Sequence, residues 1–207
     1  MSEPGAVAQE LEEVVSGVFS WHVADDRIGG ATSASHAVRG DDGSFVLIDP
    51  LPLADSELAR LEPVEAIVLT AATHQRSSWR YRARFAAPVY LPAGSRETDE
   101  EPDARYGADA PLPGHLLAVH APGPEQPHYA LLLERDGGVL FCPDQLMRGP
   151  DGALGFVPFE FHEDGAETRR TVERLLELPF SVLCLDHGAP IVDDPKQAIR
   201  DLLAATA

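Results

Sequence analysis

The order of strand-like and helix-like segments constrains the fold of this chain more than any other feature. In the first half, the apolar runs Phe45–Ile48 and Ala66–Leu69 come before a helix expected over Ser77–Phe85. In the second half, the runs Tyr129–Glu134 and Val139–Cys142 also come before segments with helical periodicity. Strands that lead each half, with helices behind them, predict a layered α+β fold built from two similar halves.

The remaining elements follow the same order. Further strands are expected over Leu11–Val23 (as one or two strands), Thr32–Arg39, Pro88–Leu91, Leu116–His120 and Val182–Leu185. Helix starts are expected at Asp55 or Ser56, at a capping box from Asp164 to Glu167, and at Asp194-Pro195. Residues 92–113 are expected to form a surface excursion with at most one turn of helix. Residues 1–9 are expected to be a flexible N-terminus, and residues 10–207 a single domain.

The acidic composition excludes one class of partner. The net charge is −18, with 34 acidic residues against 16 basic ones. Such a chain repels nucleic-acid phosphates, so we expect a small-molecule ligand and no nucleic acid. No apolar run approaches 18 residues and the N-terminus lacks a signal-peptide pattern, so no membrane association is expected. The two cysteines lie inside apolar runs, as buried reduced thiols do, so a cytoplasmic protein is expected. The composition leaves the oligomeric state open.

Five short sequence motifs follow one another along the chain. They are Val46–Asp49, Ile67–Thr70, Val119–Gly123, Leu140–Asp144 and Leu183–Gly188. This order and spacing resembles the metallo-β-lactamase superfamily over nearly the whole chain. The resemblance implies a four-layered αββα sandwich with its site at the edges of the sheets. It also implies one or two metal ions, commonly zinc or iron, and a water that attacks an ester, amide, thioester or phosphodiester.

Most of the metal ligands that the resemblance implies are missing. The family's His-x-His-x-Asp-His motif directly follows Thr70, and its four ligand positions hold Ala71, Thr73, Gln75 and Arg76. Arg76 would place a positive charge where a cation should lie, and Pro124 replaces the family's His after Pro-Gly. The bridging Asp is kept as Asp144 and the last His as His187, while Asp49 matches a family Asp that supports the ligands. The sequence therefore predicts that the dinuclear site is absent.

Two histidines outside the family's ligand positions leave a different metal site open. His74 lies in the loop after Thr70, and His128 lies five residues after Gly123. Together with Asp144 and His187 they make a candidate site for one metal ion with three imidazoles and one carboxylate. The alternative is that these histidines only form hydrogen bonds within their loops.

Two further features carry weaker hypotheses. Arg76 and Arg80 lie on one face of the expected helix near its start, where the helix dipole and the planar guanidinium groups attract an anion. The alternative is that they form salt bridges with surface acids. Cys142 and Cys184 lie two or three residues before Asp144 and His187, the positions that match family ligands. They are either reactive thiols or small buried residues, and their apolar surroundings favour burial.

These residues support two functional hypotheses. The missing ligands favour a divergent, non-catalytic protein that binds a small molecule or an anion and has no cofactor. The alternative is a hydrolase with a reduced, mononuclear site for zinc or iron that acts on an ester or phosphoester. In that alternative, Asp144 and His187 are the expected catalytic residues, and His74 and His128 complete the metal site.

Overall fold

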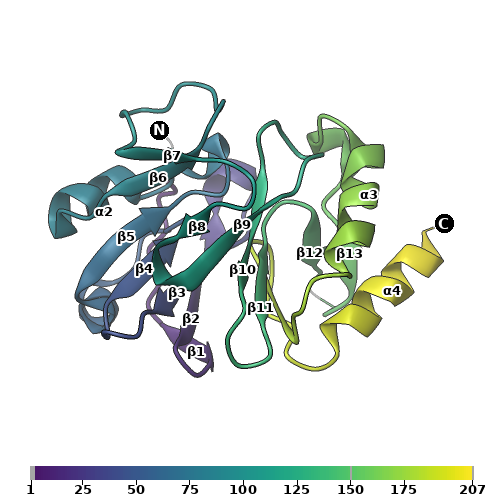
Figure 1. Cartoon of the computed structure of the whole chain (residues 1–207), viewed down its shortest axis with the longest axis horizontal. Helices are drawn as coiled ribbons and strands as arrows, with labels where there is room; N and C mark the ends of the chain where they lie inside the picture. Colours follow the sequence, from purple (N-terminus) through teal and green to yellow (C-terminus); the bar gives the residue numbers. More distant parts are fainter. Residues whose placement is uncertain (1–2, 150, 207) are drawn as a thin grey trace.

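The computed structural model describes residues 3–149 and 151–206. Within these residues, the first sheet contains strands β1 to β7 in sequence order (Figure 1). The strands are β1 Glu12–Val15, β2 Val18–Asp25, β3 Ala31–Arg39, β4 Phe45–Ile48, β5 Val64–Val68, β6 Val89–Pro92 and β7 Ala104–Tyr106. The strands from β1 to β4 pair antiparallel, and those from β4 to β7 pair parallel. The loops after β4 and β5 therefore meet at one edge of the sheet.

The second sheet has the strand order β14-β11-β10-β9-β8. Its strands are β8 Pro111–Leu112, β9 Leu116–His120, β10 Tyr129–Leu133, β11 Val139–Cys142 and β14 Val182–Leu185. The strands β11 and β14 are parallel, so the loops after them also meet at one edge. A separate ribbon pairs β12, Leu146–Arg148, with β13, Leu154–Phe156.

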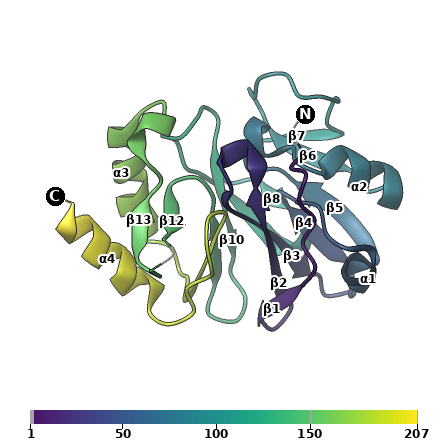
Figure 2. The same cartoon turned by 180° about the vertical axis from the view of Figure 1, so that it is seen from behind.

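Helices flank the two sheets on their outer faces (Figures 1 and 2). The first sheet carries α1, Asp55–Leu58, and α2, Ser78–Phe85; the second carries α3, Gly165–Leu175, and α4, Pro195–Ala205. Short 3-10 turns are η1 Asp26–Ile28, η2 Ala59–Leu61, η3 Ala72–His74, η4 Pro113–His115 and η5 Phe159–Phe161. None of the helices in the described part of the chain is long and apolar enough to cross a membrane.

Apolar clusters separate the four layers, because side chains of one strand alternate between two faces. Val46 on β4 packs between the sheets, whereas its neighbour Leu47 packs toward α1 and α2. Likewise, Leu131 on β10 packs between the sheets, and Leu132 packs toward α3 and α4. Strands buried on both faces explain the continuous apolar runs of the sequence. The predicted αββα sandwich is confirmed.

The local signals for the second-half helices are also confirmed. The Asp164 side chain accepts a hydrogen bond from the backbone N of Glu167 at 2.8 Å, where α3 begins. Pro195 is the first residue of α4, and Asp194 caps that helix. For α1, the expected cap at Asp55 or Ser56 is wrong, because Ala54 holds the cap position and makes no side-chain cap bond.

Two predictions about irregular segments need correction. Residues 92–113 were expected to form a surface excursion, but they contain the strands β7 and β8. Both strands lie at sheet edges, where hydrogen bonds to one neighbouring strand hold them and no apolar pattern is required. The segment 1–9 was expected to be loose, but Ala8 is buried and forms a parallel bridge with Leu53. The backbone N of Ala8 donates to the Pro52 carbonyl oxygen at 3.0 Å, so the described residues 3–9 pack on the domain. Residues 1 and 2 lie outside the described part.

Candidate functional site

The polar residues singled out in the sequence meet where the edges of the two sheets face each other. Asp49 follows β4, and His74 lies in η3 after β5. From the second sheet, Asp144 follows β11 and His187 follows β14. His128 directly precedes β10, whose antiparallel pairing with β11 brings its start beside the end of β11. Loops distant in sequence therefore supply one cluster.

His74 bridges the two sheets through both of its ring nitrogens. Its Nδ1 lies 3.0 Å from Oδ2 of Asp49, and its Nε2 lies 3.0 Å from Oδ2 of Asp144. The side chain is buried, which by itself lowers the pKa of an imidazole. The carboxylates of Asp144 and Asp49 outweigh burial and raise the pKa of His74 well above its usual range. The two carboxylates that hold His74 therefore favour its protonated form when no metal is bound.

His128 and His187 approach the same carboxylate from other directions. The Nε2 of His128 lies 3.7 Å from Oδ2 of Asp144, and the Nε2 of His187 lies 3.2 Å from Oδ1. His128 is fully buried, and its Nε2 has no hydrogen-bond partner among the described residues. Burial alone raises the pKa of Asp144, but the charge of His74, the hydrogen bond from His187 and the nearby ring of His128 bring it well below its usual range. Asp144 is thus an ionised carboxylate with three imidazoles around it.

Each of the three histidines is oriented through its other ring nitrogen. The Nδ1 of His74 contacts Asp49, and the Nδ1 of His187 lies 2.9 Å from the Thr32 carbonyl oxygen. The Nδ1 of His128 lies 3.1 Å from the Ala121 carbonyl oxygen and 3.0 Å from Nε2 of Gln145. Histidines that bind metals are held in this way, with Nδ1 on a carboxylate or carbonyl and Nε2 toward the ion.

Arg76 takes part in the cluster through a buried ion pair. It precedes α2, is 3% exposed, and its Nη2 contacts Oδ2 of Asp186 at 2.8 Å. Arg80 lies at the surface and pairs with Glu3 at 2.5 Å. The two guanidinium groups do not converge, and the charge of Arg76 is already matched by a buried carboxylate. This geometry does not favour the expected anion site on Arg76 and Arg80.

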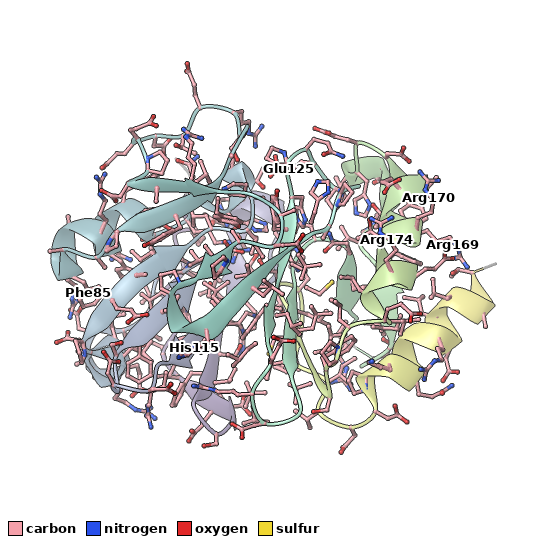
Figure 3. The ribbon with its side chains drawn as sticks, in the orientation of Figure 1. Phe85, His115, Glu125, Arg169, Arg170 and Arg174 are labelled. Atoms are coloured by element: carbon pink, nitrogen blue, oxygen red, sulfur yellow. The ribbon has the colours of Figure 1, made fainter. Side chains whose placement is uncertain are left out.

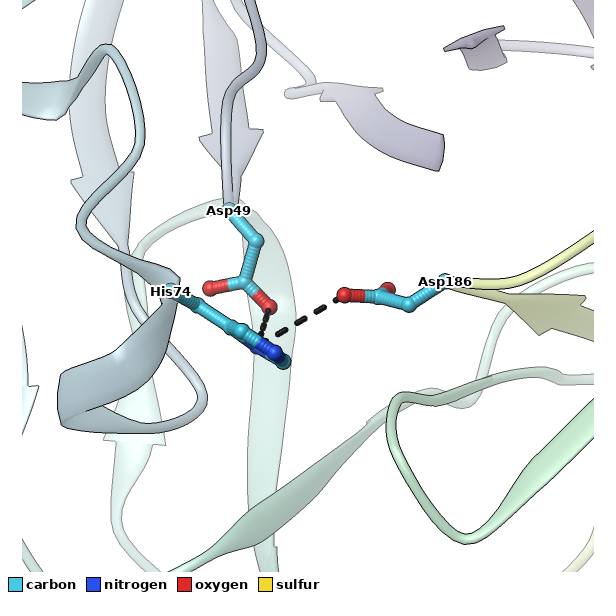
Figure 4. A group of neighbouring side chains, drawn as sticks. All are labelled: Asp49, His74 and Asp186. Atoms are coloured by element: carbon cyan, nitrogen blue, oxygen red, sulfur yellow. Dashed lines mark hydrogen bonds and ion pairs between the residues drawn. The ribbon is translucent and has the colours of Figure 1, made fainter. Parts of the chain in front are cut away.

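Asp49, His74 and Asp186 form a second possible donor group beside the three imidazoles (Figure 4). Within the described residues, one donor atom from each of them lies within 4.8 Å of the other two. All three side chains are buried, and Oδ2 of Asp186 lies 3.6 Å from Nδ1 of His74. Asp49 also accepts hydrogen bonds from the backbone N and the hydroxyl of Thr70. The donors of this group are therefore already engaged by Thr70 and by Arg76.

A cavity of about 630 Å³ opens beside Asp144 and His187. Most of its remaining wall is apolar and comes from η1, η5, β12 and the loop after β9, with the charged side chains of Arg27 and Glu125 also lining it. The apolar wall residues are Ile28, Met147, Val157, Pro158 and Phe161. Thr73, which holds one of the family's ligand positions, also lines the cavity. Cavities with a mostly apolar wall and a few polar groups are typical of small-molecule sites.

Two members of this region were not among the residues predicted from the sequence. Asp186 pairs with Arg76, and its only signal in the sequence is its place at the strand end beside His187. His162 also lines the cavity, and its Nδ1 lies 2.8 Å from Oγ1 of Thr168. The buried Nε2 of His162 has no partner among the described residues, and burial lowers the pKa of this ring.

The two cysteines are buried, as their apolar surroundings suggested. Cys142 is 1% exposed, and Cys184 is 0% exposed. Cys142 packs toward α3 and α4, whereas Cys184 packs between the sheets. Burial raises the pKa of both thiols far above the usual range, so neither forms a thiolate at neutral pH.

Solved structures share the fold of this chain. No protein-family model matches the chain, and no curated protein matches its sequence. The DIM-1 metallo-β-lactamase aligns with a TM-score of 0.74 and 15% identity over 98% of this chain and 99% of that chain. A metallo-β-lactamase family protein from Thermus thermophilus aligns at 0.66 and 18% over 94% and 80%. The metallo-β-lactamase FIM-1 from Pseudomonas aeruginosa, in its mono-zinc form, aligns at 0.70 and 13% over 100% and 99%.

The chain therefore has the metallo-β-lactamase fold, as the order of its sequence motifs predicted. TM-scores of this size establish a common fold, and identities this low leave the chemistry to the residues of the site.

Proposed function

We propose that this protein is a hydrolase that binds one metal ion, zinc or iron, through His74, His128 and His187, with Asp144 as the carboxylate of the site. The observation that carries the proposal is the arrangement of three Nε2 atoms around one carboxylate. They lie 3.0, 3.7 and 3.2 Å from oxygens of Asp144. Imidazole nitrogens with one carboxylate are the donor set that zinc and iron accept in hydrolytic sites.

Two further observations support this donor set. The Nε2 of His128 is buried without a hydrogen-bond partner among the described residues, and such an atom is costly unless something else binds it. The charges also fit. The cluster contains the carboxylates of Asp49, Asp144 and Asp186 and the guanidinium of Arg76, which pairs with Asp186, so two negative charges are left for protons or a divalent ion to balance.

The dinuclear site of the fold is not part of the proposal. Ala71 and Pro124 offer no metal-binding side chain, and Arg76 is held by Asp186. A bound ion would act as a Lewis acid on a carbonyl or phosphoryl oxygen and make a water more acidic. The chain's own residues then have separate tasks. Asp144, whose side chain is 22% exposed, would orient the attacking water, and His187 reaches the cavity where substrate would lie.

The cavity indicates the kind of substrate. Its apolar wall fits a hydrocarbon or aromatic group, and Asp144 and His187 lie at the same cavity. An ester or phosphoester with an apolar substituent places its reacting bond beside the two polar residues while the substituent leaves water.

Metal content and turnover together test the proposal. Protein purified without chelator is expected to contain one zinc or iron per chain, by mass spectrometry of the metal, and to hydrolyse members of an ester and phosphoester panel. His187→Ala is expected to lose the metal and the activity together. His115→Ala is the control, because His115 is exposed, pairs with the exposed Asp41, and lies away from Glu125 of the cavity wall in Figure 3. Turnover and metal content that are unchanged in His187→Ala would rule the proposal out.

A second candidate, a non-catalytic protein that binds a small molecule, is favoured by a specific observation. His74 and Arg76 supply positive charges to the buried carboxylates from within the chain. A cluster balanced in this way needs no metal to be stable. Chelator-free protein that contains no stoichiometric zinc or iron, and whose melting temperature does not respond to added metal, would favour this candidate.

A further inference from the structure

A buried chain of polar groups lies behind His128, on the side of its Nδ1. It runs from the imidazole through the side chain of Gln145 to the thiol of Cys142. His128 and Gln145 are 0% exposed, and Cys142 is 1% exposed. Because burial removes water as a partner, these groups must satisfy one another's hydrogen bonds. The chain therefore influences which nitrogen of His128 carries the ring proton.

The network fixes the orientation of the Gln145 amide. One of its two outer atoms lies 2.6 Å from the carbonyl oxygen of Ala121. A carbonyl oxygen only accepts hydrogen bonds, so this atom is the amide nitrogen, Nε2. The amide oxygen then accepts from the thiol of Cys142, whose Sγ lies 3.4 Å away. Gln145 thus presents an N–H donor beside the ring of His128, with 3.0 Å between Nε2 and Nδ1.

Each neutral tautomer of His128 has its own set of partners. With the proton on Nε2, this nitrogen faces Oδ2 of Asp144 at 3.7 Å, and the bare Nδ1 accepts from Gln145. With the proton on Nδ1, the ring donates to the Ala121 carbonyl oxygen at 3.1 Å, and the bare Nε2 faces the carboxylate. A lone pair facing a carboxylate is unfavourable unless a cation lies between them. The first tautomer therefore suits a metal-free site, and the second suits a metal-bound one.

We propose that Gln145 is a positioning residue that holds His128 in the Nε2–H tautomer until a metal ion binds, when the ring proton is transferred to Nδ1. The ring loses the proton of Nε2 and gains one at Nδ1, where the Ala121 carbonyl oxygen accepts it, so His128 stays neutral. The inference rests on the proposed function for the ion, and it names the residue that opposes metal binding at this ligand.

The proposal predicts an unusual effect of removing the amide. In Gln145→Met or Gln145→Leu, the Nε2–H tautomer loses the donor to Nδ1, whereas the Nδ1–H tautomer keeps the Ala121 oxygen. The balance should shift toward Nδ1–H, and zinc should bind about 3- to 10-fold more tightly, as expected for the loss of one hydrogen bond. A residue that only supports a ligand has the opposite effect, because its loss weakens metal binding.

Nitrogen NMR of isotopically labelled protein at pH 8 tests the proposal, because protonated and bare ring nitrogens differ widely in chemical shift. The signals of His128 are identified by their loss in His128→Gln. Wild type and both Gln145 variants are compared with EDTA and with Zn²⁺, and zinc affinity is measured against a competing chelator. Wild type is expected to change from Nε2–H to Nδ1–H when zinc binds. Cys184→Ala is the control, because Cys184 is buried outside this chain of groups, and it should behave as wild type.

The outcomes separate this inference from the proposed function. A wild type that is already Nδ1–H in EDTA would overturn the inference. Folded Gln145 variants with an unchanged tautomer ratio, or with unchanged or weaker zinc binding, would also overturn it. If neither variant folds, the tautomers of wild type with and without zinc decide. If wild type binds no zinc, the proposed function and the metal-driven transfer both fail, while the tautomer ratios in EDTA still decide whether Gln145 holds His128 as Nε2–H.

Discussion

Nε2 of His74 lies 3.0 Å from Oδ2 of Asp144, although His74 follows a strand of the first sheet and Asp144 follows a strand of the second. This contact joins the two halves of the chain at their shared edge. It lies beside the buried contact of His74 with Asp49. The stability of the sandwich and the composition of the candidate site therefore depend on the same residues.

Replacement of Asp144 by Asn tests this dependence. The amide keeps the shape of the side chain but removes the charge that faces three imidazoles, so the protein should lose about 1–3 kcal/mol of unfolding free energy. Urea unfolding followed by circular dichroism measures the loss. Asp41→Asn is the matched control, because Asp41 is exposed and its pair with His115 is also exposed. Equal stability of the two variants would show that the His74–Asp144 contact contributes nothing.

Gly123 should not tolerate a side chain. Its φ is 130°, and a Cβ built there lies 2.2 Å from Oγ1 and 2.5 Å from the backbone N of Thr168, at the start of α3. Gly123→Ala is expected to destabilise the protein by about 1–3 kcal/mol or more through overpacking and strain. Gly107→Ala has open space around the new Cβ and should be nearly neutral. Chemical denaturation of both variants gives the comparison, and similar midpoints would contradict the packing described for α3.

Acid stability should depend on Asp25. Burial alone would raise its pKa, but hydrogen bonds from Arg27 and Ser33 and the charge of Arg27 lower it from 3.8 to about 2. A lowered pKa adds stability above pH 3.8, and this contribution is lost as the pH falls from about 3.8 toward 2. The contribution at neutral pH is about 2 kcal/mol. Asp25→Asn should therefore lower stability at pH 7 and flatten its decline between pH 4 and 2, measured by denaturation at each pH.

The cavity wall should affect substrate selection if the proposed hydrolase activity is present. Phe161 is 70% exposed at this wall, so Phe161→Ala removes apolar contact without disturbing the core. The variant should raise KM about 3- to 10-fold for an octanoyl ester and little for an acetyl ester, because only the longer chain reaches the apolar wall. Values of kcat should change little. An equal change of KM for both esters would place the acyl group elsewhere.

The two cysteines should be unreactive in the native protein. Both thiols are buried and both have raised pKa values, so a thiol reagent such as Ellman's should modify neither at pH 8. In guanidinium chloride, both should react within minutes. Rapid modification of either thiol in folded protein would show that the strand carrying it opens readily. Circular dichroism under the same conditions confirms that the protein is folded.

Sequence patterns predicted correctly those elements that depend on interactions between neighbouring residues. The apolar runs of β4, β10 and β11 and the cap at Asp164 are properties of neighbouring residues, and the structure has them where they were expected. The edge strands β7 and β8 were missed because one neighbouring strand stabilises them through backbone hydrogen bonds. The backbone of any residue except proline can donate such a bond, so the sequence carries little signal for it.

The partners of Arg76 show the opposite case. Its place at the family's ligand position was visible in the sequence, and so was the charge conflict with a cation. Its partner was not, because Asp186 lies on a distant strand of the other sheet. The same holds for His162, which the packing of α3 against the loop at Gly123 brings to the cavity.

The sequence by itself determined the layered fold, because periodicity and motif order are properties of neighbouring residues, and it identified His74, His128, Asp144 and His187 as candidates. Only the tertiary structure decided that three imidazoles face Asp144 while a buried Asp186 holds Arg76. Those contacts join loops of two sheets. Which carboxylate meets which cation depends on sheet packing and burial, and no local pattern encodes either one.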